Sequence, residues 1–399
     1  MRISDNIREL QPSATLAVTA LARELAAQGR DIVDLSAGEP DLPTPEFAAA
    51  AGIEAIQKGH TRYTAASGLP ALKKAIAADL EQRAGRAIDP AGVVVTAGAK
   101  QALFNVCFTL FGPGDRVLLP VPYWTSYPDL IRLARAEPLE IRGDAARDFK
   151  VTAEQLEEAY EPAVRGIILN SPSNPTGAVY DRDEFESIVR WAVERDVWVI
   201  SDEIYGRLCY VAERAPGLLD LDPAYLRRAI IVDGASKSFA MTGWRIGFSY
   251  SDPALAGKMG ALQSHITSNP ATPSQYAALA AYGETGARDA AVATLRATFL
   301  RRRDLVVNLL REKLPQVSYV SPDGAFYLFI RVDSFFTPEA PDSIALCRWL
   351  LQEAGVALVP GAAFGDDRYA RLSFATSDEA LIEGITRVAG AVTAVGQNA

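Results

Sequence analysis

Histidine and cysteine are scarce in this sequence, and their scarcity limits the chemistry available to the protein. Only His60 and His265 occur among 399 residues, so a three-histidine metal site is impossible, and each is better explained as a structural polar residue than as a catalytic base. Cys107, Cys209 and Cys347 form no CxxC pair, which supports neither a disulfide framework nor a zinc site. The sequence therefore predicts no bound metal.

Positive charge and long apolar runs are also lacking. The formal net charge of -9 argues against a nucleic-acid partner, which would require a basic face. No apolar run approaches the length that spans a membrane, and the opening residues, MRISDNIREL, lack the apolar core of a signal peptide. We expect a cytoplasmic protein with no nucleic-acid or membrane partner, in which local arginines and lysines hold any bound anion.

Short Val- and Ile-rich runs alternate with helical patterns from about residue 44 onward. The runs are continuously apolar, which indicates burial on both faces, as in an α/β fold with a parallel sheet between helices. A helix is expected from Lys100 to about Gly112, and another after Asp181, where Asp-Arg-Asp-Glu has the spacing of a capping box. The expected strands are 93–96, 116–120, 166–170, 197–201 and 229–233.

The last third has a different, α+β pattern, and 399 residues suffice for two domains. A helix is expected around 290–313, followed by strands near 326–330, 356–359 and 369–374. Near the N-terminus, a helix at 16–28 precedes a short strand at 32–35. We expect residues 1–45 to form an N-terminal arm and part of a small domain, 46–280 a large domain, and 281–399 the rest of the small domain.

Unusual polar residues follow the ends of three consecutive strands. Asn174 lies in SPSNPTG, Asp202 and Tyr205 lie in SDEIY, and Lys237 lies in GASK. Each has a simpler explanation, as a turn residue, a helix cap, a core tyrosine and a solvated lysine. Because ligands bind beyond the carboxyl ends of parallel strands, the four together fit a single site better.

This set of side chains suits pyridoxal phosphate. A lysine amine can form a Schiff base with its aldehyde, and a carboxylate such as Asp202 can hold its pyridine nitrogen protonated. Asn174 and Tyr205 offer hydrogen bonds to its ring oxygen. Its phosphate would need the charge of Arg245, the hydroxyl of Ser236, and the amides of 97–100 at the start of a helix.

Two further residues have both a structural and a functional interpretation. Trp124, in VPYWTSY, is either a core aromatic or a ring that lies against the cofactor. Arg371, in ARLSF, is either a surface arginine of a strand or the partner of a substrate carboxylate, and we favour the second interpretation.

The motifs SPSNPTG, SDEIY, GASKSFAMTGWRIG and RLSFATS, in that order, resemble those of class I aminotransferases of fold type I. The similarity covers residues 12 to about 377. It is greatest to the bacterial aspartate and aspartate/prephenate aminotransferase branch, which shares GHTRYTAASGLPAL and AGAKQALFN.

The resemblance implies a pyridoxal 5'-phosphate enzyme in which Lys237 bonds to the cofactor and carries the proton between substrate and cofactor. It implies that Asp202 pairs with the ring nitrogen and that Tyr205 contacts the ring oxygen, as catalytic residues beside Lys237. The other implied contacts are Asn174 and Trp124 with the ring, Gly98, Ala99, Lys100, Ser236 and Arg245 near the phosphate, and Tyr63 from the second subunit of a homodimer.

The resemblance also implies the substrate contacts. Arg371, Asn174 and the backbone of Gly38 would bind the α-carboxylate, with Trp124 beside them, and Lys100 would meet the distal carboxylate of an acidic substrate. Ser13 and Thr15 match a segment that closes over the substrate. Three positions depart from the pattern: Gly234 replaces a Ser or Thr, and His265 and Ile266 occupy positions that are commonly polar.

The expected reaction is a ping-pong exchange between an L-amino acid, aspartate or glutamate, and a 2-oxo acid, 2-oxoglutarate or oxaloacetate. Prephenate is a second candidate acceptor. The alternatives are an aminotransferase for aromatic or neutral amino acids, a C–S β-lyase, and a non-enzymatic regulator. A dehydrogenase is disfavoured because no strand leads into GxGxxG.

Overall fold

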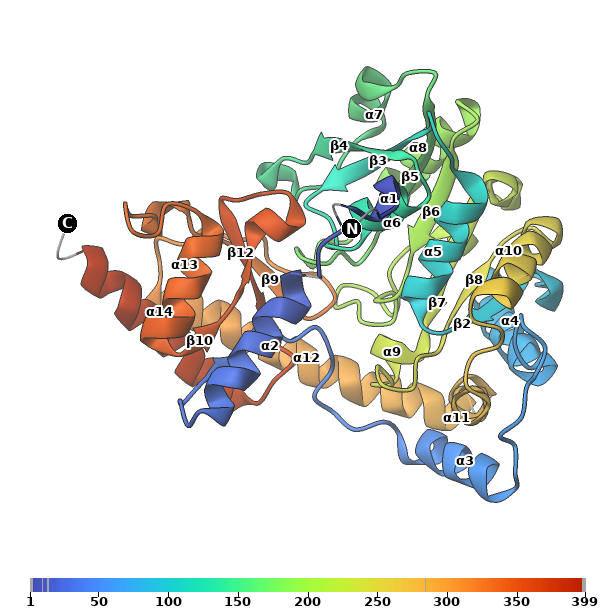
Figure 1. The fold of residues 1–399 in the computed structure, drawn as a ribbon, viewed down its shortest axis with the longest axis horizontal. Helices are drawn as coiled ribbons and strands as arrows, with labels where there is room; N and C mark the ends of the chain where they lie inside the picture. Colours follow the sequence, from blue (N-terminus) through green and yellow to red (C-terminus); the bar gives the residue numbers. More distant parts are fainter. Residues whose placement is uncertain (1–2, 9, 13, 284, 397–399) are drawn as a thin grey trace.

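A seven-stranded sheet forms the centre of the larger part of the molecule (Figure 1). The computed structural model describes residues 3–8, 10–12, 14–283 and 285–396. The strand order is β2-β8-β7-β6-β5-β3-β4, and β8 is antiparallel to both of its neighbours, whereas the other pairs are parallel. The strands are β2 (Val93–Thr96), β3 (Arg116–Val121), β4 (Glu137–Arg142), β5 (Val164–Asn170), β6 (Trp198–Asp202), β7 (Ala229–Gly234) and β8 (Gly247–Tyr250).

The five strands predicted for this region are confirmed, as is the α/β class, but β4 and β8 were not predicted. The edge strand β4 has one buried residue, so it lacks the continuous apolar signal of the inner strands. Strand β8 is only four residues long and contains a glycine and a serine. Continuous apolar runs therefore locate five of the seven strands and miss two of mixed composition, β4 at one edge and β8 inside the sheet.

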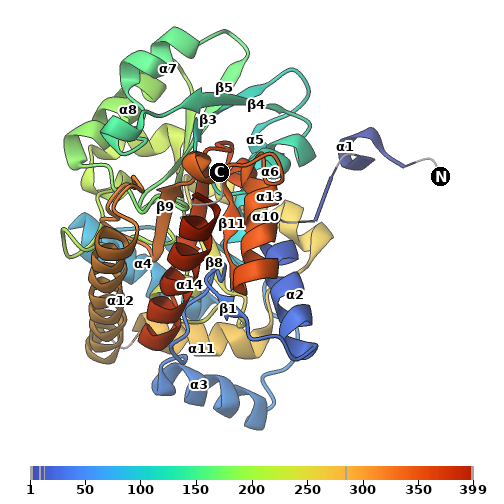
Figure 2. The same ribbon diagram turned by 90° about the vertical axis from the view of Figure 1, so that its left-hand side faces the viewer.

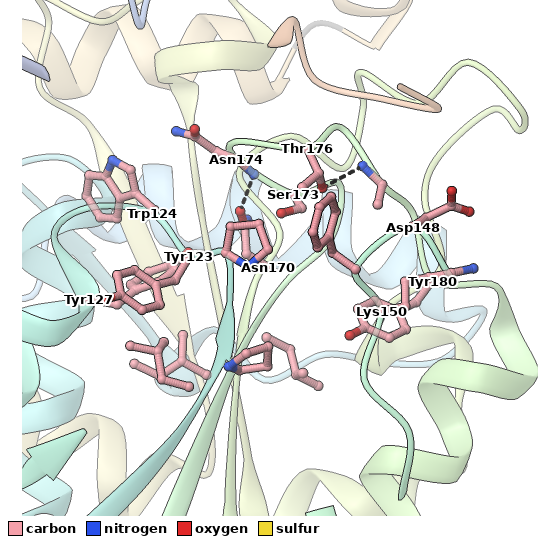
Figure 3. A pocket seen from close by; sticks show the side chains of 17 residues that line it. Tyr123, Trp124, Tyr127, Asp148, Lys150, Asn170, Ser173, Asn174, Thr176 and Tyr180 are labelled. Carbon is pink, nitrogen blue, oxygen red and sulfur yellow. Dashed lines mark hydrogen bonds between the residues drawn. The ribbon is translucent and has the colours of Figure 1, made fainter. Parts of the chain in front are cut away.

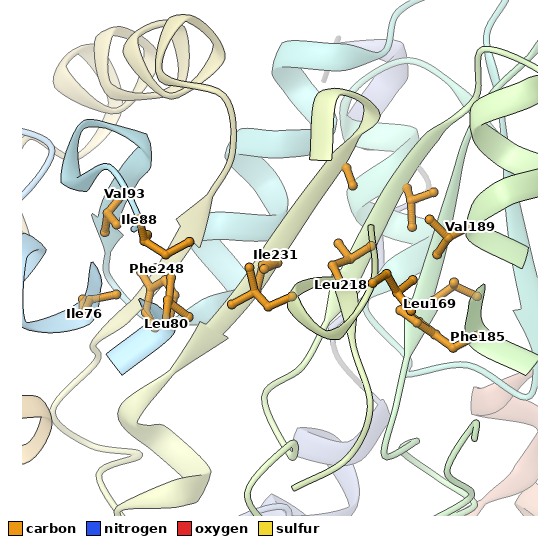
Figure 4. Packing of buried hydrophobic residues seen from close by; sticks show 14 of the residues in the cluster. Ile76, Leu80, Ile88, Val93, Leu169, Phe185, Val189, Leu218, Ile231 and Phe248 are labelled. Carbon is orange, nitrogen blue, oxygen red and sulfur yellow. The ribbon is translucent and has the colours of Figure 1, made fainter. Parts of the chain in front are cut away.

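Helices cover both faces of the sheet, because successive strand residues point to opposite sides. Ile231 belongs to the cluster that Figure 4 shows, which also contains residues of α4 and α8, whereas Ile230 belongs to a second cluster with residues of α5, α6 and α10. The predicted capping box at Asp181 is confirmed, since Asp181 Oδ1 accepts from Glu184 N at 2.8 Å and Glu184 Oε2 accepts from Asp181 N at 3.0 Å. The helices of this part are α3 (Glu46–Gln57), α4 (Pro70–Ala84), α5 (Ala99–Leu110), α6 (Tyr127–Leu133), α7 (Ala153–Ala159), α8 (Arg182–Glu194), α9 (Ala235–Ser238), α10 (Pro253–Ile266) and α11 (Thr272–Gly283).

The C-terminal part has its own antiparallel sheet, in the order β11-β12-β9, and its own hydrophobic cluster. Helices α12 and α14 lie side by side there (Figure 2), and α12 extends back toward the large sheet. The expected strand 356–359 is two short strands that pair with different partners, so that prediction was wrong in detail. The elements are β9 (Tyr327–Arg331), β10 (Val356–Ala357), β11 (Val359–Pro360), β12 (Tyr369–Ser373), α12 (Thr285–Lys313), α13 (Ser343–Trp349) and α14 (Asp378–Gly396).

The N-terminal residues join the C-terminal part, across more than three hundred residues of sequence. Strand β1 (Val33–Asp34) pairs in parallel with β10, and Ala22 of α2 (Ala14–Ala27) packs against Leu351 and Ala357. The short helix α1 (Asp5–Arg8) precedes them. We keep the boundaries at residues 45 and 280 as a proposal, which the separate hydrophobic clusters support. No helix of the described residues is long and apolar enough to cross a bilayer.

Candidate active site

A cavity of about 620 Å³ opens at the carboxyl ends of β5, β6 and β7, between the two parts of the molecule. The position agrees with the rule that parallel sheets bind ligands beyond these ends. Most of the predicted site residues line it: Gly38, Ala99, Lys100, Trp124, Asn174, Asp202, Tyr205, Ser236, Lys237, Arg245 and Arg371. Residues that are far apart in the sequence therefore line a single cavity.

Lys237 lies in α9, directly after β7, and its Nζ donates a hydrogen bond to the backbone oxygen of Gly38. The pKa of the Lys237 amine is lowered to about 8, chiefly by burial; the carboxylate of Glu39 opposes this shift, and the cations Arg371 and Arg245 add to it. The amine is therefore easier to deprotonate than a lysine in water, which suits a nucleophile or a base.

Asp202 ends β6 and is only 3% exposed. Its carboxylate accepts from Tyr127 Oη at 2.7 Å and from Ile204 N at 3.2 Å. Burial nevertheless raises the pKa of Asp202 to about 7. A cation held against this carboxylate would offset the cost of its buried charge.

Asn174 is fixed by a chain of hydrogen bonds that begins at Asp202. The Asn170 side chain donates to Asp202 O at 3.0 Å and accepts from Asn174 N at 2.8 Å. Figure 3 shows this contact in a smaller adjoining pocket, which shares Trp124 and Tyr127 with the main cavity. The backbone of Asn174 is thus held at the cavity wall by the ends of two neighbouring strands.

Tyr205 lies three residues after Asp202 and lines the same cavity. Its Oη is 2.9 Å from Tyr327 Oη, and its ring centroid is 6.0 Å from Lys237 Nζ. The phenol is therefore both placed beside the lysine and fixed in direction by a second tyrosine, which comes from β9 in the other part of the molecule.

Arg371, in β12, is only 1% exposed. Its guanidinium donates to Asn174 Oδ1 at 3.1 Å and to Ser36 O at 2.7 Å, while its buried Nε has no partner among the described residues. The Cζ atom of Arg371 lies 4.3 Å from the centroid of the Tyr327 ring. Burial lowers the pKa of the Arg371 guanidinium. Within the described part of the chain no carboxylate pairs with this buried cation, so the site offers a place for an anionic ligand.

The opposite wall of the cavity can also hold an anion. Helix α5 begins after Gly98, whose φ is 84°, and a Cβ at Gly98 would lie only 2.4 Å from Arg245 Nη2. Arg245 donates from Nη1 to Thr242 O at 3.0 Å, and the buried Ser236 lies at the same wall. The amides of Ala97 and Gly98 already donate within the chain, to Gln101 Oε1 and Thr96 O, so the donors for a phosphate are the amides of the first turn of α5, the guanidinium and the hydroxyl.

Lys100 lies on the first turn of α5, with Nζ 5.0 Å from the centroid of the Trp124 ring. Burial and the charge of Arg245 lower the pKa of its ammonium. Two cations, Lys100 and Arg371, therefore face one cavity from different elements. A ligand with two carboxylates could engage both.

The remaining predicted residues are placed as follows. Thr15 lines the cavity, whereas Ser13 lies outside the described residues. Tyr63 is not part of the cavity and is 89% exposed, and Ile266 is 47% exposed. The presence of glycine at position 234 has a local explanation, since a Cβ there would lie 2.8 Å from Gly247 Cα of the neighbouring strand. The departure from Ser or Thr at this position therefore follows from close packing of β7 against β8.

Sequence reasoning missed several residues that line the site, among them Tyr127, Asn170, Tyr327 and Glu39. Tyr327 lies in an apolar stretch, whereas Tyr127 follows the turn residues Thr125 and Ser126; both are almost wholly buried, as core tyrosines are. Asn170 ends a predicted strand, a position that could have drawn attention to it.

The family model for aminotransferases of class I and II matches residues 30–388. An aspartate aminotransferase of Geobacillus stearothermophilus is 40% identical, over 97% of this chain and 98% of the relative. An aspartate/prephenate aminotransferase of Cereibacter sphaeroides is 42% identical, over 97% of both chains. The solved structure of Thermus thermophilus aspartate aminotransferase with maleate superposes with a TM-score of 0.92 at 38% identity, covering 98% of this chain and all of that one.

Proposed function

Because this chain belongs to the aminotransferases of class I and II, we propose that it transfers an amino group between aspartate or glutamate and a 2-oxo acid by a ping-pong mechanism. The chain is an aminotransferase that depends on pyridoxal 5'-phosphate. The observation that carries the proposal about its substrates is the pair of cations, Arg371 and Lys100, that line one cavity with Lys237.

The described residues fit the cofactor. Bound pyridoxal phosphate supplies an aldehyde that condenses with amines and a ring that accepts electrons from the substrate. Asp202, whose carboxylate needs a cation, would pair with the ring nitrogen, and Asn174 and Tyr205 would bind the ring oxygen. Trp124 would cover a ring face, and the phosphate would lie between Gly98, Ala99, Lys100, Ser236 and Arg245.

Substitution of Gly98 by alanine is expected to weaken cofactor binding by about tenfold to a hundredfold. The new Cβ would displace the Arg245 guanidinium, and the positive φ strains any side chain. Titration of the apoenzyme with pyridoxal phosphate, followed by absorbance, measures the affinity. Gly257→Ala is the control, because a Cβ at this helical glycine meets open space; equal affinity for both variants would contradict the proposed phosphate site.

The substrate would bind through its α-carboxylate to Arg371, with Asn174 and the backbone of Gly38 beside it. The freed Lys237 amine would then remove the proton from the substrate Cα and return it to the cofactor carbon. The lowered pKa of Lys237, about 8, makes its neutral form more accessible near pH 7 than that of a lysine in water, which suits proton transfer.

The acidic specificity is assigned to Lys100. Its ammonium lies 5.0 Å from the Trp124 ring, and its lowered pKa indicates a charge that is partly withdrawn from water. An aspartate held at Arg371 by one carboxylate could direct the other to Lys100. Rapid glutamate formation from aspartate and 2-oxoglutarate tests the proposal, whereas activity only with phenylalanine or leucine would contradict it.

Lys100→Ala is expected to reduce kcat/KM for aspartate by about tenfold to a hundredfold, and to leave alanine almost unchanged. The reason is that only the acidic substrate has a second carboxylate. Lys74→Ala, which removes an exposed lysine from α4, is the control for the change in net charge. If both substrates keep their rates in Lys100→Ala, the enzyme is an aminotransferase for neutral or aromatic amino acids.

Two other reactions are outcomes of the same assays. The relative from Cereibacter sphaeroides is named for aspartate and prephenate, which makes prephenate a second acceptor to measure. A C–S β-lyase would release pyruvate and ammonia from cystathionine with no oxo acid present, and that result would replace the proposal.

We also propose that the enzyme is a cytoplasmic homodimer. The 89% exposure of Tyr63 supports a role outside its own cavity, at the phosphate of a second copy. The three cysteines are free and buried, as is usual in a reducing compartment.

A further inference from the structure

The carboxylate of Glu39 has no part in the reaction as described above. Glu39 lines the cavity beside Lys237, Thr242 and Arg245. Its Oε2 accepts a hydrogen bond from Thr242 Oγ1 at 2.7 Å. The backbone oxygen of Thr242 in turn accepts from Arg245 Nη1 at 3.0 Å, so the carboxylate is linked to residues 237–245, the end of α9 and the loop that follows it.

The segment that carries Glu39, residues 38–44, is attached to this loop at both of its ends. At one end Gly38 O accepts from Lys237 Nζ. At the other end Thr44 Oγ1 donates to Ala240 O at 3.0 Å and accepts from Trp244 Nε1 at 3.0 Å. The position of Glu39 relative to the lysine is therefore fixed by contacts on either side of it.

The 38–44 segment is also held from the other part of the molecule. The buried Arg302 of α12 forms two hydrogen bonds with Asp41, at 2.6 and 2.8 Å. A paired arrangement of this kind restrains a side chain more than a single contact does. Glu39 thus belongs to a segment that is anchored on both domains, not to a free loop.

Four charged groups act on the Lys237 nitrogen, each from a different part of the chain. Arg371 of β12 and Arg245 of the loop disfavour the ammonium form, and Asp202 of β6 favours it. Among these groups Glu39 has the strongest effect, and it favours the ammonium form. Two uncharged rings also lie near the nitrogen: their centroids are 6.0 Å (Tyr205) and 5.7 Å (Phe326) from it.

We propose that Glu39 is a positioning residue that acts through Lys237: from the anchored 38–44 segment its carboxylate places a negative charge in the cavity of Lys237, which favours the protonated nitrogen that Gly38 O accepts from. This inference rests on the proposed function, because it requires Lys237 to be the proton carrier. Glu39 itself touches neither substrate nor cofactor in this role, and it balances the two arginines that would otherwise expel the proton.

The test is a pH titration of the holoenzyme. The visible absorbance of bound pyridoxal phosphate changes with the protonation of the nitrogen that joins it to Lys237. In Glu39→Gln the midpoint of this change is expected to fall by about one pH unit, since one nearby charge is removed. We also expect kcat to fall about tenfold, with KM for aspartate changed less than twofold.

Three comparison variants make the result specific. Glu158→Gln removes an exposed carboxylate from α7 and should leave the midpoint where it is in the wild type. Glu39→Asp keeps the negative charge, so its midpoint should lie close to that of the wild type. Thr242→Val removes only the hydrogen bond to Glu39, so a smaller shift in the same direction is expected, and this variant serves if Glu39→Gln fails to fold.

An unshifted midpoint in both Glu39→Gln and Thr242→Val would overturn the role of Glu39 and leave the proposed transamination intact. A wild-type protein with no lysine-linked absorbance and no amino-group exchange would instead overturn the proposed function. The two failures are therefore distinguishable in one set of titrations.

Discussion

Replacement of Lys237 by alanine is expected to reduce amino-group exchange between aspartate and 2-oxoglutarate by at least about 10⁴-fold. The amine has two tasks in the proposed reaction, as the covalent anchor of the cofactor and as the carrier of the Cα proton. No other amine can substitute for it, because the second lysine that lines the cavity, Lys100, lies at the start of α5 against the Trp124 ring. The measurement is glutamate formation with the purified variant.

The same variant should still fold and bind the cofactor without a covalent bond. Reduction with borohydride, followed by mass spectrometry of peptides, should label the wild-type peptide that contains Lys237 and give no label in the variant. Lys258→Ala, at an exposed position of α10, is the matched control and should keep both activity and label. A label on another lysine of the wild type would contradict every role assigned around Lys237.

The position of this lysine could be predicted from sequence because it follows a strong signal. Strand β7 is buried along its whole length, so its end is clear in the sequence, and Lys237 comes three residues later. Asp202 and Tyr205 follow β6 in the same way, and Asn174 follows β5. Parallel strands bring such residues to one edge without any further information.

The partners of these residues could not be predicted, because their packing is set by distant parts of the chain. Tyr127 reaches Asp202 from α6, and Tyr327 reaches Tyr205 from β9, 122 residues away. Both tyrosines are buried among apolar side chains and have the sequence context of ordinary core residues. Neither the hydrogen bond nor its length follows from local pattern.

Glu39 was missed for a different reason. It lies in a polar stretch, SAGEPD, where acidic residues are common. The strand before it, β1, is only two residues long, so no apolar run marks Glu39 as a residue at a strand end. Its place beside Lys237 depends on how residues 38–44 are attached to the loop at 240–244, which only the folded chain shows. The electrostatic balance at the lysine is therefore a property of the tertiary structure.

Replacement of Arg371 by lysine is expected to reduce kcat/KM by about 10²- to 10⁴-fold, for acidic and neutral amino acids alike. Every amino acid has an α-carboxylate, whereas only aspartate and glutamate have the second one assigned to Lys100. A lysine keeps the charge but loses the planar pair of donors that can bind a carboxylate while contacting Asn174 and Ser36. Parallel assays with aspartate and alanine measure this difference.

Stability should change much less than activity in this variant. The guanidinium is buried and its Nε has no partner among the described residues; a lysine would forfeit two hydrogen bonds of roughly 1 kcal/mol each, together with the contact of the guanidinium with the Tyr327 ring. Arg331→Lys, at an exposed position of β9, is the control and should alter neither quantity. A site that keeps an unpaired buried cation at little benefit to the fold is explained by the anion that it binds. Arg371→Lys with full activity toward alanine would show that the α-carboxylate binds elsewhere.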